Sequence, residues 1–202
     1  MVRSPKRGSF EASLRTVEVS TEDLYRLSTR PLSEPYFADQ GRNRFDDPAG
    51  MNGVASFGVL YAGHTPMVAF AESVAHENSM FNARSGCFEV SSATLHGRSL
   101  VTFVHPRRPH LKMVDLTGEA LKALGLNNDL CAGNKYRVPQ RWSAAIHGAM
   151  SDADGLRFTS RQTNSSFCYA VFDRSGLEKD DEAELPDDVL KKLCATFNVR
   201  EV

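Results

Sequence analysis

Residues 58–76 read GVLYAGHTPMVAFAESVAH, and this stretch predicts a strand followed at once by a helix. Val59–Tyr61 is a short apolar run typical of a buried strand. Thr65 then supplies an N-cap residue, and Pro66 a first-turn proline, for an alanine-rich helix. On that helix Glu72 has mostly apolar neighbours three and four residues away, so its carboxylate emerges beside apolar surface. On these residues alone an ordinary surface glutamate is the simpler explanation, and a functional carboxylate is the alternative.

Length and composition indicate one ordinary globular domain. The chain has 202 residues, of which 41% are hydrophobic and 24% charged. No apolar run is long enough to span a bilayer, so we expect no membrane contact. Lys and Arg number 24 against 25 Asp and Glu, and the resulting formal charge of -1 gives no global reason to expect nucleic acid as a direct partner.

The amino-terminal residues favour a cytoplasmic protein, and the spacing of the histidines and cysteines gives no sign of a metal site. The first ten residues carry charge but no apolar stretch, so they are not a secretory signal, and we expect 1–10 to be a loose arm that orders only against a partner. The six histidines show no zinc spacing. The four cysteines, Cys87, Cys131, Cys168 and Cys194, form no C-x-x-C pair. They are expected to be reduced thiols, and three of the four have the apolar sequence neighbours of core residues.

The rest of the chain alternates short strands with a few helices. A segment rich in Pro, Gly, Asn and Asp, 31–53, is expected to be a long loop, and 127–136 another. Helical segments are predicted at 66–75, 118–124, from Pro139 through Ala149 with Trp142 on the buried face, and 186–197, with a further turn of helix near 24–27. Apolar, β-branched runs predict strands at 14–19, 59–61, 87–94, 99–104, 112–116, 156–160 and 167–172. The sum is a single α+β domain over 1–202, with central, mostly antiparallel β-sheets and about four surrounding helices.

Several common catalytic motifs are absent, and a dispersed set of polar residues is left. There is no Walker loop, no G-x-G-x-x-G, no G-x-S-x-G and no H-E-x-x-H. Arg44 lies in the long loop, Tyr61 ends a strand, Glu72 is on a helix and Ser160 ends another strand. These residues supply, in the same order, a forked donor for phosphate, an aromatic face, a carboxylate and a positioning hydroxyl. This set fits cleavage of a ribosyl bond to a cationic leaving group such as the nicotinamide of NAD.

These segments also resemble a known family. GRNRFDDP, GVLYAGHTPMVAFAESVAH, the helix with Arg141-Trp142, and DGLRFTSRQTNSSFCYAVFD follow one another over about 24–173, and in this order they resemble the RES-domain family. One departure is that Gly50–Phe57 looks inserted between Arg44 and Tyr61. The choice of motif arginine therefore stays open between Arg42 and Arg44; Phe45-Asp46 after Arg44 favours the latter.

The resemblance implies an ADP-ribosyltransferase-like fold and a toxin of a toxin–antitoxin pair that degrades NAD, in some members with inorganic phosphate as co-substrate. It implies no further cofactor, an Xre-type antitoxin with a DNA-binding region as partner, and a homodimer as a plausible assembly. Carried onto this chain, Arg44 would hold the pyrophosphate or the phosphate acceptor, and Tyr61 would orient the nicotinamide. Glu72 would bind the ribose and stabilise its cationic transition state, and Ser160 would position either the ribose or Glu72. From its location we add Arg161 as a second phosphate contact.

Three other functions stay open. A protein side chain in place of phosphate or water as acceptor would make the chain a protein ADP-ribosyltransferase, and the sequence does not separate these acceptors. A non-catalytic nucleotide- or partner-binding module is the alternative of another class, although the joint presence of the four motif residues argues against a degenerate site. A nucleic-acid binder using the basic arm and residues 105–110 is disfavoured by the near-zero net charge.

Overall fold

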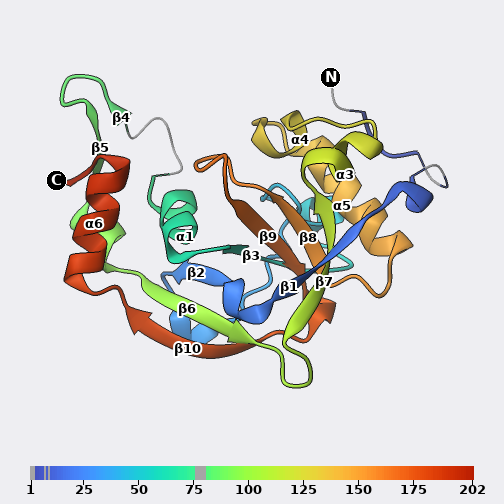
Figure 1. The fold of residues 1–202 in the computed structure, drawn as a ribbon, viewed down its shortest axis with the longest axis horizontal. Helices are drawn as coiled ribbons and strands as arrows, with labels where there is room; N and C mark the ends of the chain where they lie inside the picture. The colour runs from blue at the N-terminus through green and yellow to red at the C-terminus, as the bar shows by residue number, and fades with distance from the viewer. Residues whose placement is uncertain (1–2, 7, 9, 76–80) are drawn as a thin grey trace.

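The computed structural model describes residues 3–6, 8, 10–75 and 81–202, and within them two sheets and six α-helices form a mixed α/β fold (Figure 1). His76, the last residue of the opening stretch, lies outside the described residues. The larger sheet has eight strands in the order β1-β7-β8-β9-β3-β2-β6-β10, and only its β7–β8 pair is parallel. The predicted α+β class with a mostly antiparallel sheet is therefore confirmed.

The elements have the following bounds. The strands of the large sheet are β1 (Thr16–Ser20), β2 (Tyr25–Ser28), β3 (Val59–Gly63), β6 (Ser99–Val104), β7 (His110–Leu116), β8 (Gly155–Thr159), β9 (Phe167–Phe172) and β10 (Glu178–Glu184). The small sheet contains β4 (Phe81–Asn82), β5 (Cys87–Val90) and β11 (Val199–Glu201). The helices are α1 (Pro66–Ser73), α2 (Ser92–His96), α3 (Gly118–Ala123), α4 (Asp129–Ala132), α5 (Arg137–Ala149) and α6 (Asp187–Phe197).

The opening stretch forms the predicted strand and helix at the centre of the sheet. Strand β3 lies between β9 and β2, and Val59 and Leu60 are fully buried because both faces of the strand are covered. The Thr65 hydroxyl accepts a hydrogen bond of 3.2 Å from the backbone N–H of Val68 and caps α1. At Gly63 an added Cβ would lie 2.6 Å from the backbone nitrogen of Ala69, so glycine lets α1 start close against the strand that precedes it.

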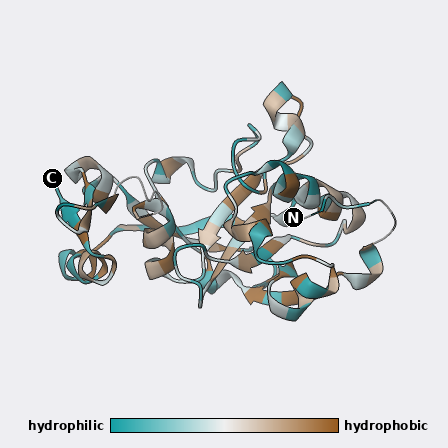
Figure 2. Ribbon diagram, turned by 90° about the horizontal axis from the view of Figure 1, so that it is seen from above, coloured by the Kyte–Doolittle hydropathy of each residue, from teal (hydrophilic) through white to brown (hydrophobic). Residues whose placement is uncertain are grey.

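Helices cover the two ends of the molecule differently. Helices α3, α4 and α5 lie near β8 and β9 at one end, and α1 and α6 lie beside the small sheet at the other (Figure 1). One core cluster joins Trp142 and Ile146 of α5 to Leu156 and Phe158 of β8. Seen from above, the brown hydrophobic residues gather on strands and inner helix faces, and the outer turns are largely teal (Figure 2). None of the helices in the described ranges is long and apolar enough to cross a bilayer.

Several local expectations are corrected by strand pairing. Residues 25–28 form strand β2 in place of a helical turn, because they pair with β3 and β6. The strand expected at 87–94 ends at Val90 and is followed by α2. Strand β10 has the acidic sequence EKDDEAE and carries no apolar signal; it forms because the edge of β6 offers unpaired backbone groups. Part of the predicted loop at 127–136 is the short helix α4.

The amino-terminal segment, expected to be a loose arm, contacts the body of the protein where it is described. The indole Nε1 of Trp142 donates a hydrogen bond of 2.8 Å to the carbonyl of Arg3, and Arg141 donates one of 3.1 Å to the Ser4 hydroxyl. The ring of Phe10 is buried edge-on against Trp142, with 5.2 Å between centroids. These contacts bind the arm to α5 without a partner, contrary to the prediction, while Trp142 is buried as predicted.

Candidate active site

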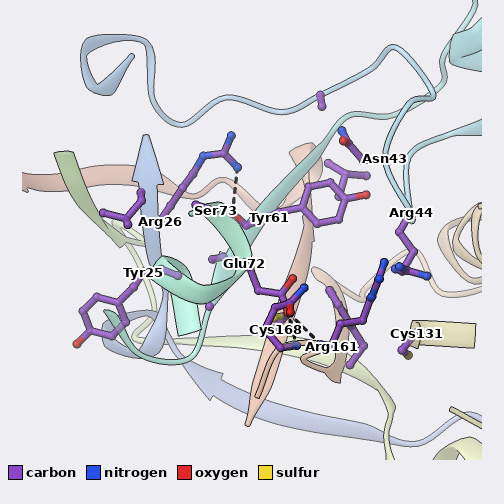
Figure 3. Close-up of a pocket in the computed structure, with 18 of the residues that line it drawn as sticks. Tyr25, Arg26, Asn43, Arg44, Tyr61, Glu72, Ser73, Cys131, Arg161 and Cys168 are labelled. Atoms are coloured by element: carbon purple, nitrogen blue, oxygen red, sulfur yellow. Dashed lines mark hydrogen bonds between the residues drawn. The ribbon is translucent and has the colours of Figure 1, made fainter. Parts of the chain in front are cut away.

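A cleft of about 460 Å³ opens where β2, β3 and α1 meet the loop around residues 36–44 and the turn after β8 (Figure 3). Of the predicted site residues, Arg44, Tyr61, Glu72 and Arg161 line this cleft. Ser160 is buried directly behind Glu72. Arg42 is exposed and is not part of the cleft wall, so Arg44 is the loop arginine that the structure places at the site.

Glu72 is fixed by the turn that follows β8. Its Oε1 accepts hydrogen bonds from the Ser160 hydroxyl at 2.6 Å, from the backbone N–H of Arg161 at 3.0 Å and from that of Gln162 at 3.4 Å. The Ser160 oxygen in turn accepts the backbone N–H groups of Gln162 and Thr163, at 3.2 and 3.0 Å. The serine therefore shapes the turn and orients the carboxylate at once, and the three hydrogen bonds from Ser160, Arg161 and Gln162 all reach Oε1.

Tyr61 presents its ring to the cleft and keeps its hydroxyl inside the protein. The hydroxyl donates to Asp46 Oδ1 at 3.0 Å and accepts the backbone N–H of Phe45 at 2.8 Å. Burial, followed by the charge of Asp46, raises the pKa of Tyr61 well above its ordinary value. The hydroxyl is therefore neutral and engaged, so the part of Tyr61 that can meet a ligand is its aromatic face.

Asp46 organises the loop that carries Arg44. It is fully buried, and its Oδ2 accepts the backbone N–H of Arg42 at 3.0 Å and, from Asn43, the backbone N–H at 2.9 Å and the side-chain amide at 3.1 Å. Burial raises the pKa of Asp46, and these hydrogen bonds act against that shift. In the sequence, Asp46 is only part of the motif that follows Arg44; its role as an anchor depends on donors that the folded loop brings together.

Arg44 is a buried guanidinium at the closed end of the cleft. Its Nη1 donates to the carbonyl of Gly133 at 2.7 Å and, more weakly, to that of Leu130 at 3.4 Å, and its guanidinium lies 4.7 Å from the ring centre of Tyr136. Burial lowers the pKa of Arg44, and the nearby charge of Arg161 acts in the same direction. A cation that is desolvated and next to a second cation favours an anionic ligand.

Gln140 supports the same loop from α5. Its side-chain amide donates to the backbone carbonyls of Gly41 at 2.8 Å and Asn43 at 2.9 Å, and the residue is buried. Gly41 has a φ of +69°, which favours glycine. No sequence signal marks Gln140, because the polar side of a helix ordinarily faces solvent and only tertiary contact turns this residue toward the loop.

Two further arginines at the opposite end of the cleft were not anticipated. Arg26 Nε pairs with the buried Glu34 at 2.8 Å, and its Nη1 donates to the carbonyl of Tyr61 at 3.0 Å. Arg98 Nε donates to the Thr94 carbonyl at 3.2 Å. Burial lowers the pKa of Arg98, and the charge of Arg26 lowers it further. Arginines at both ends make the cleft strongly positive.

The two cysteines in the wall of the cleft are buried, protonated thiols. Burial raises the pKa of Cys131 to about 12 and that of Cys168 well above its ordinary value. No group of three or more His, Cys, Asp or Glu side chains within the described ranges is placed to hold a metal ion. The groups that remain for chemistry are the Glu72 carboxylate, the arginines and the face of Tyr61.

Replacing Asp46 with alanine is expected to destabilise the protein by about 1–3 kcal/mol, because it removes the acceptor of two backbone N–H groups and of the Tyr61 hydroxyl in a buried loop. Urea unfolding measures the change. The matched control is Asp39→Ala in the same loop, since Asp39 is exposed and should change stability by less than about 0.5 kcal/mol. Equal stability of the two variants would contradict the anchoring role of Asp46.

Comparison with known proteins identifies the family and the fold of the chain. The family model described as RES domain matches residues 23–188. No curated protein matches the sequence. Among solved structures, a chain of the crystal structure of the M. tuberculosis MbcT–MbcA toxin–antitoxin complex is similar, with a TM-score of 0.61 and 19% identity over 92% of this chain and 94% of that one. At that identity the similarity establishes the fold alone. Because the RES model extends over most of the chain and includes Arg44, Tyr61, Glu72 and Ser160, the protein belongs to the RES domain family.

Proposed function

We propose that the protein cleaves the bond between nicotinamide and ribose in NAD. One observation carries the proposal: Glu72, held by Ser160 at 2.6 Å and by the backbone of Arg161 at 3.0 Å, lies in a single cleft with the face of Tyr61 and the guanidinium of Arg44. Residues 116 positions apart in the sequence, 44 and 160, thus meet around one carboxylate. A positioned carboxylate in a cleft that is otherwise positive suits a substrate with an anionic diphosphate and a cationic reacting end.

The mechanism that we propose is dissociative. The bond from the ribose carbon C1′ to the nicotinamide nitrogen breaks, and nicotinamide leaves as a neutral molecule with the bonding electron pair. The ribose then carries an oxocarbenium-like charge, which the Glu72 carboxylate stabilises because the cleft lowers the local dielectric. An oxygen of phosphate or water forms the new bond to C1′. Phosphate gives ADP-ribose 1″-phosphate, and water gives ADP-ribose with release of one proton.

The other residues bind and orient in this scheme. The ring of Tyr61 is the surface against which nicotinamide is held, since its hydroxyl is occupied by Asp46. Arg44 and Arg161 bind phosphate groups, and Ser160 keeps the carboxylate in place. Neither thiol is needed as a nucleophile. NAD is a substrate, and no additional cofactor enters the scheme.

We further propose a toxin role, with a protein antitoxin as partner. The support is family membership and the similarity in fold to a chain of a complex that is named as a toxin–antitoxin pair. An Xre-type antitoxin with a DNA-binding region, a cytoplasmic location and a homodimeric state complete the proposal. Bacterial expression of this chain alone should deplete NAD and arrest growth, and co-expression of the antitoxin should restore both.

Incubation of the purified protein with NAD, in phosphate buffer and in phosphate-free buffer, tests the enzymatic proposal. If the enzyme is a phosphorylase, mass spectrometry should find nicotinamide and ADP-ribose 1″-phosphate only where phosphate is present. If it is a glycohydrolase, nicotinamide and plain ADP-ribose should form in both buffers. If NAD labelled in its ADP-ribose part transfers the label only to added protein, the enzyme is a protein ADP-ribosyltransferase. Intact NAD in every buffer would contradict the proposal and favour a binding module.

A further inference from the structure

The charge of the cleft is not balanced by the residues around it. Four arginines line it, and only Arg26 has a carboxylate partner within salt-bridge distance among the described residues, namely Glu34. Arg44, Arg98 and Arg161 have none in the described part of the chain. Among the described residues, Glu72 is the one acidic side chain that lines the cleft itself. The described residues therefore leave the cleft with two more positive than negative charges, which favours anionic ligands.

At the closed end, Arg44 and Arg161 converge beside Glu72 (Figure 3). Arg44 uses Nη1 for the carbonyl of Gly133, and its Nε and Nη2 have no hydrogen-bond partner among the described residues. The guanidinium of Arg161 likewise has no such partner in the described part of the chain, although its backbone N–H donates to Glu72 Oε1. Arg44 is only 8% exposed. This end therefore offers a forked set of donors in a space that suits a small anion.

At the open end, Arg26 and Arg98 lie together beside β2. Ser28 of β2 pairs with Ser99 of β6, which places Arg98 next to the end of the strand that carries Arg26. Figure 3 shows Arg26 and Tyr25 on the opposite side of Glu72 from Arg44. Tyr36 also lines this end and is 45% exposed, so the cleft here is open and bordered by aromatic rings. An open end bordered by aromatic rings suits a nucleotide, whose base can lie against a ring.

We propose that the cleft has two separate anion subsites, one on each side of Glu72: Arg98 with Arg26 binds the diphosphate of NAD, and Arg161 with Arg44 binds the phosphate acceptor. This inference rests on the proposed NAD cleavage. The acceptor oxygen must approach to about 3–3.5 Å of C1′, the carbon whose developing charge Glu72 stabilises. Arg161 is the arginine next to that carbon, because its backbone N–H donates a hydrogen bond to Glu72 Oε1. The diphosphate is separated from C1′ by the ribose and its 5′ oxygen, so it lies farther from Glu72.

This arrangement assigns acceptor choice to Arg161. Phosphate held between Arg161 and Arg44 supplies the oxygen that bonds to C1′ after nicotinamide has departed with the electron pair of the broken bond. Without Arg161, water takes that place and the product is ADP-ribose. Arg161 is then a determinant of phosphorolysis over hydrolysis, and Arg98 is a determinant of dinucleotide affinity.

Calorimetry tests the two subsites without requiring turnover. ADP-ribose and inorganic phosphate are each titrated into the wild type, Arg98→Gln, Arg161→Gln and the control Arg107→Gln, whose side chain is exposed in the loop after β6. We expect Arg98→Gln to weaken ADP-ribose by about tenfold or more with phosphate affinity within about twofold, and Arg161→Gln to do the reverse. Phosphate should also bind to protein saturated with ADP-ribose, and Arg107→Gln should match the wild type.

The outcomes separate this inference from the proposed function. Competition between phosphate and ADP-ribose, or weakening of the same ligand by both variants, overturns the two subsites even if the enzyme cleaves NAD. Intact NAD together with the expected binding pattern contradicts the proposed reaction and leaves the two subsites supported. In an active enzyme, Arg161→Gln should raise the KM for phosphate and shift the product toward ADP-ribose, and Arg98→Gln should raise the KM for NAD.

Discussion

Replacing Glu72 with glutamine is expected to lower NAD turnover by about 10²–10³-fold while the protein stays folded. Glutamine has the same shape and keeps an oxygen that can accept the Ser160 hydroxyl, which lies 2.6 Å from Oε1 in the wild type. It lacks the negative charge that stabilises the oxocarbenium-like ribose. The loss should therefore appear in kcat, measured as release of nicotinamide at saturating NAD.

The control for this variant is Glu119→Gln, an exposed glutamate in the first turn of α3, which should turn over NAD like the wild type. Thermal unfolding of both variants establishes that they are folded. Near wild-type turnover by a folded Glu72→Gln protein would remove Glu72 from the mechanism, and with it the proposed site.

The second large effect is expected at Arg44. Arg44→Lys should reduce turnover at limiting NAD and phosphate by about 10–150-fold, which corresponds to about 1.5–3 kcal/mol for a lost hydrogen bond to a charged group. A lysine has no planar fork, so it cannot hold the Gly133 carbonyl and also present two donors to a phosphate group. Initial rates at several substrate concentrations separate this loss of binding from a loss of kcat.

Arg42→Gln is the matched control, two residues away in the same loop. Arg42 is exposed and lies outside the cleft wall, so its replacement should change the rate by less than about twofold. A loss of activity in Arg42→Gln with retention in Arg44→Lys would reverse the choice of motif arginine.

Secondary structure could be predicted from the sequence where the residues that favour an element lie within that element. The apolar run at β3, the cap at Thr65 and the proline that follows predict a strand and a helix from neighbouring residues alone, and both are present. Elements whose only cause is pairing were missed: β10 is acidic and carries no apolar signal, and β2 was predicted as a helical turn. These strands are stabilised by hydrogen bonds to a neighbouring strand, and the sequence of one segment does not reveal such a neighbour.

By itself, the sequence determined the class of fold, the family and the four residues around which the candidate site is built. Tyr61, Glu72 and Ser160 could be named because their segments follow one another in the order of the RES family, and Arg44 was favoured over Arg42 because Phe45-Asp46 follows it. Only the tertiary structure decided how they act together. It placed Arg44 inside the cleft and Arg42 outside, held the Tyr61 hydroxyl on Asp46, and brought Gln140 and Arg98 to the site from distant elements. The physical reason is that hydrogen bonding, burial and electrostatic interaction depend on distances in space, and residues far apart in the chain come close only when the strands pair and the helices pack on the sheet.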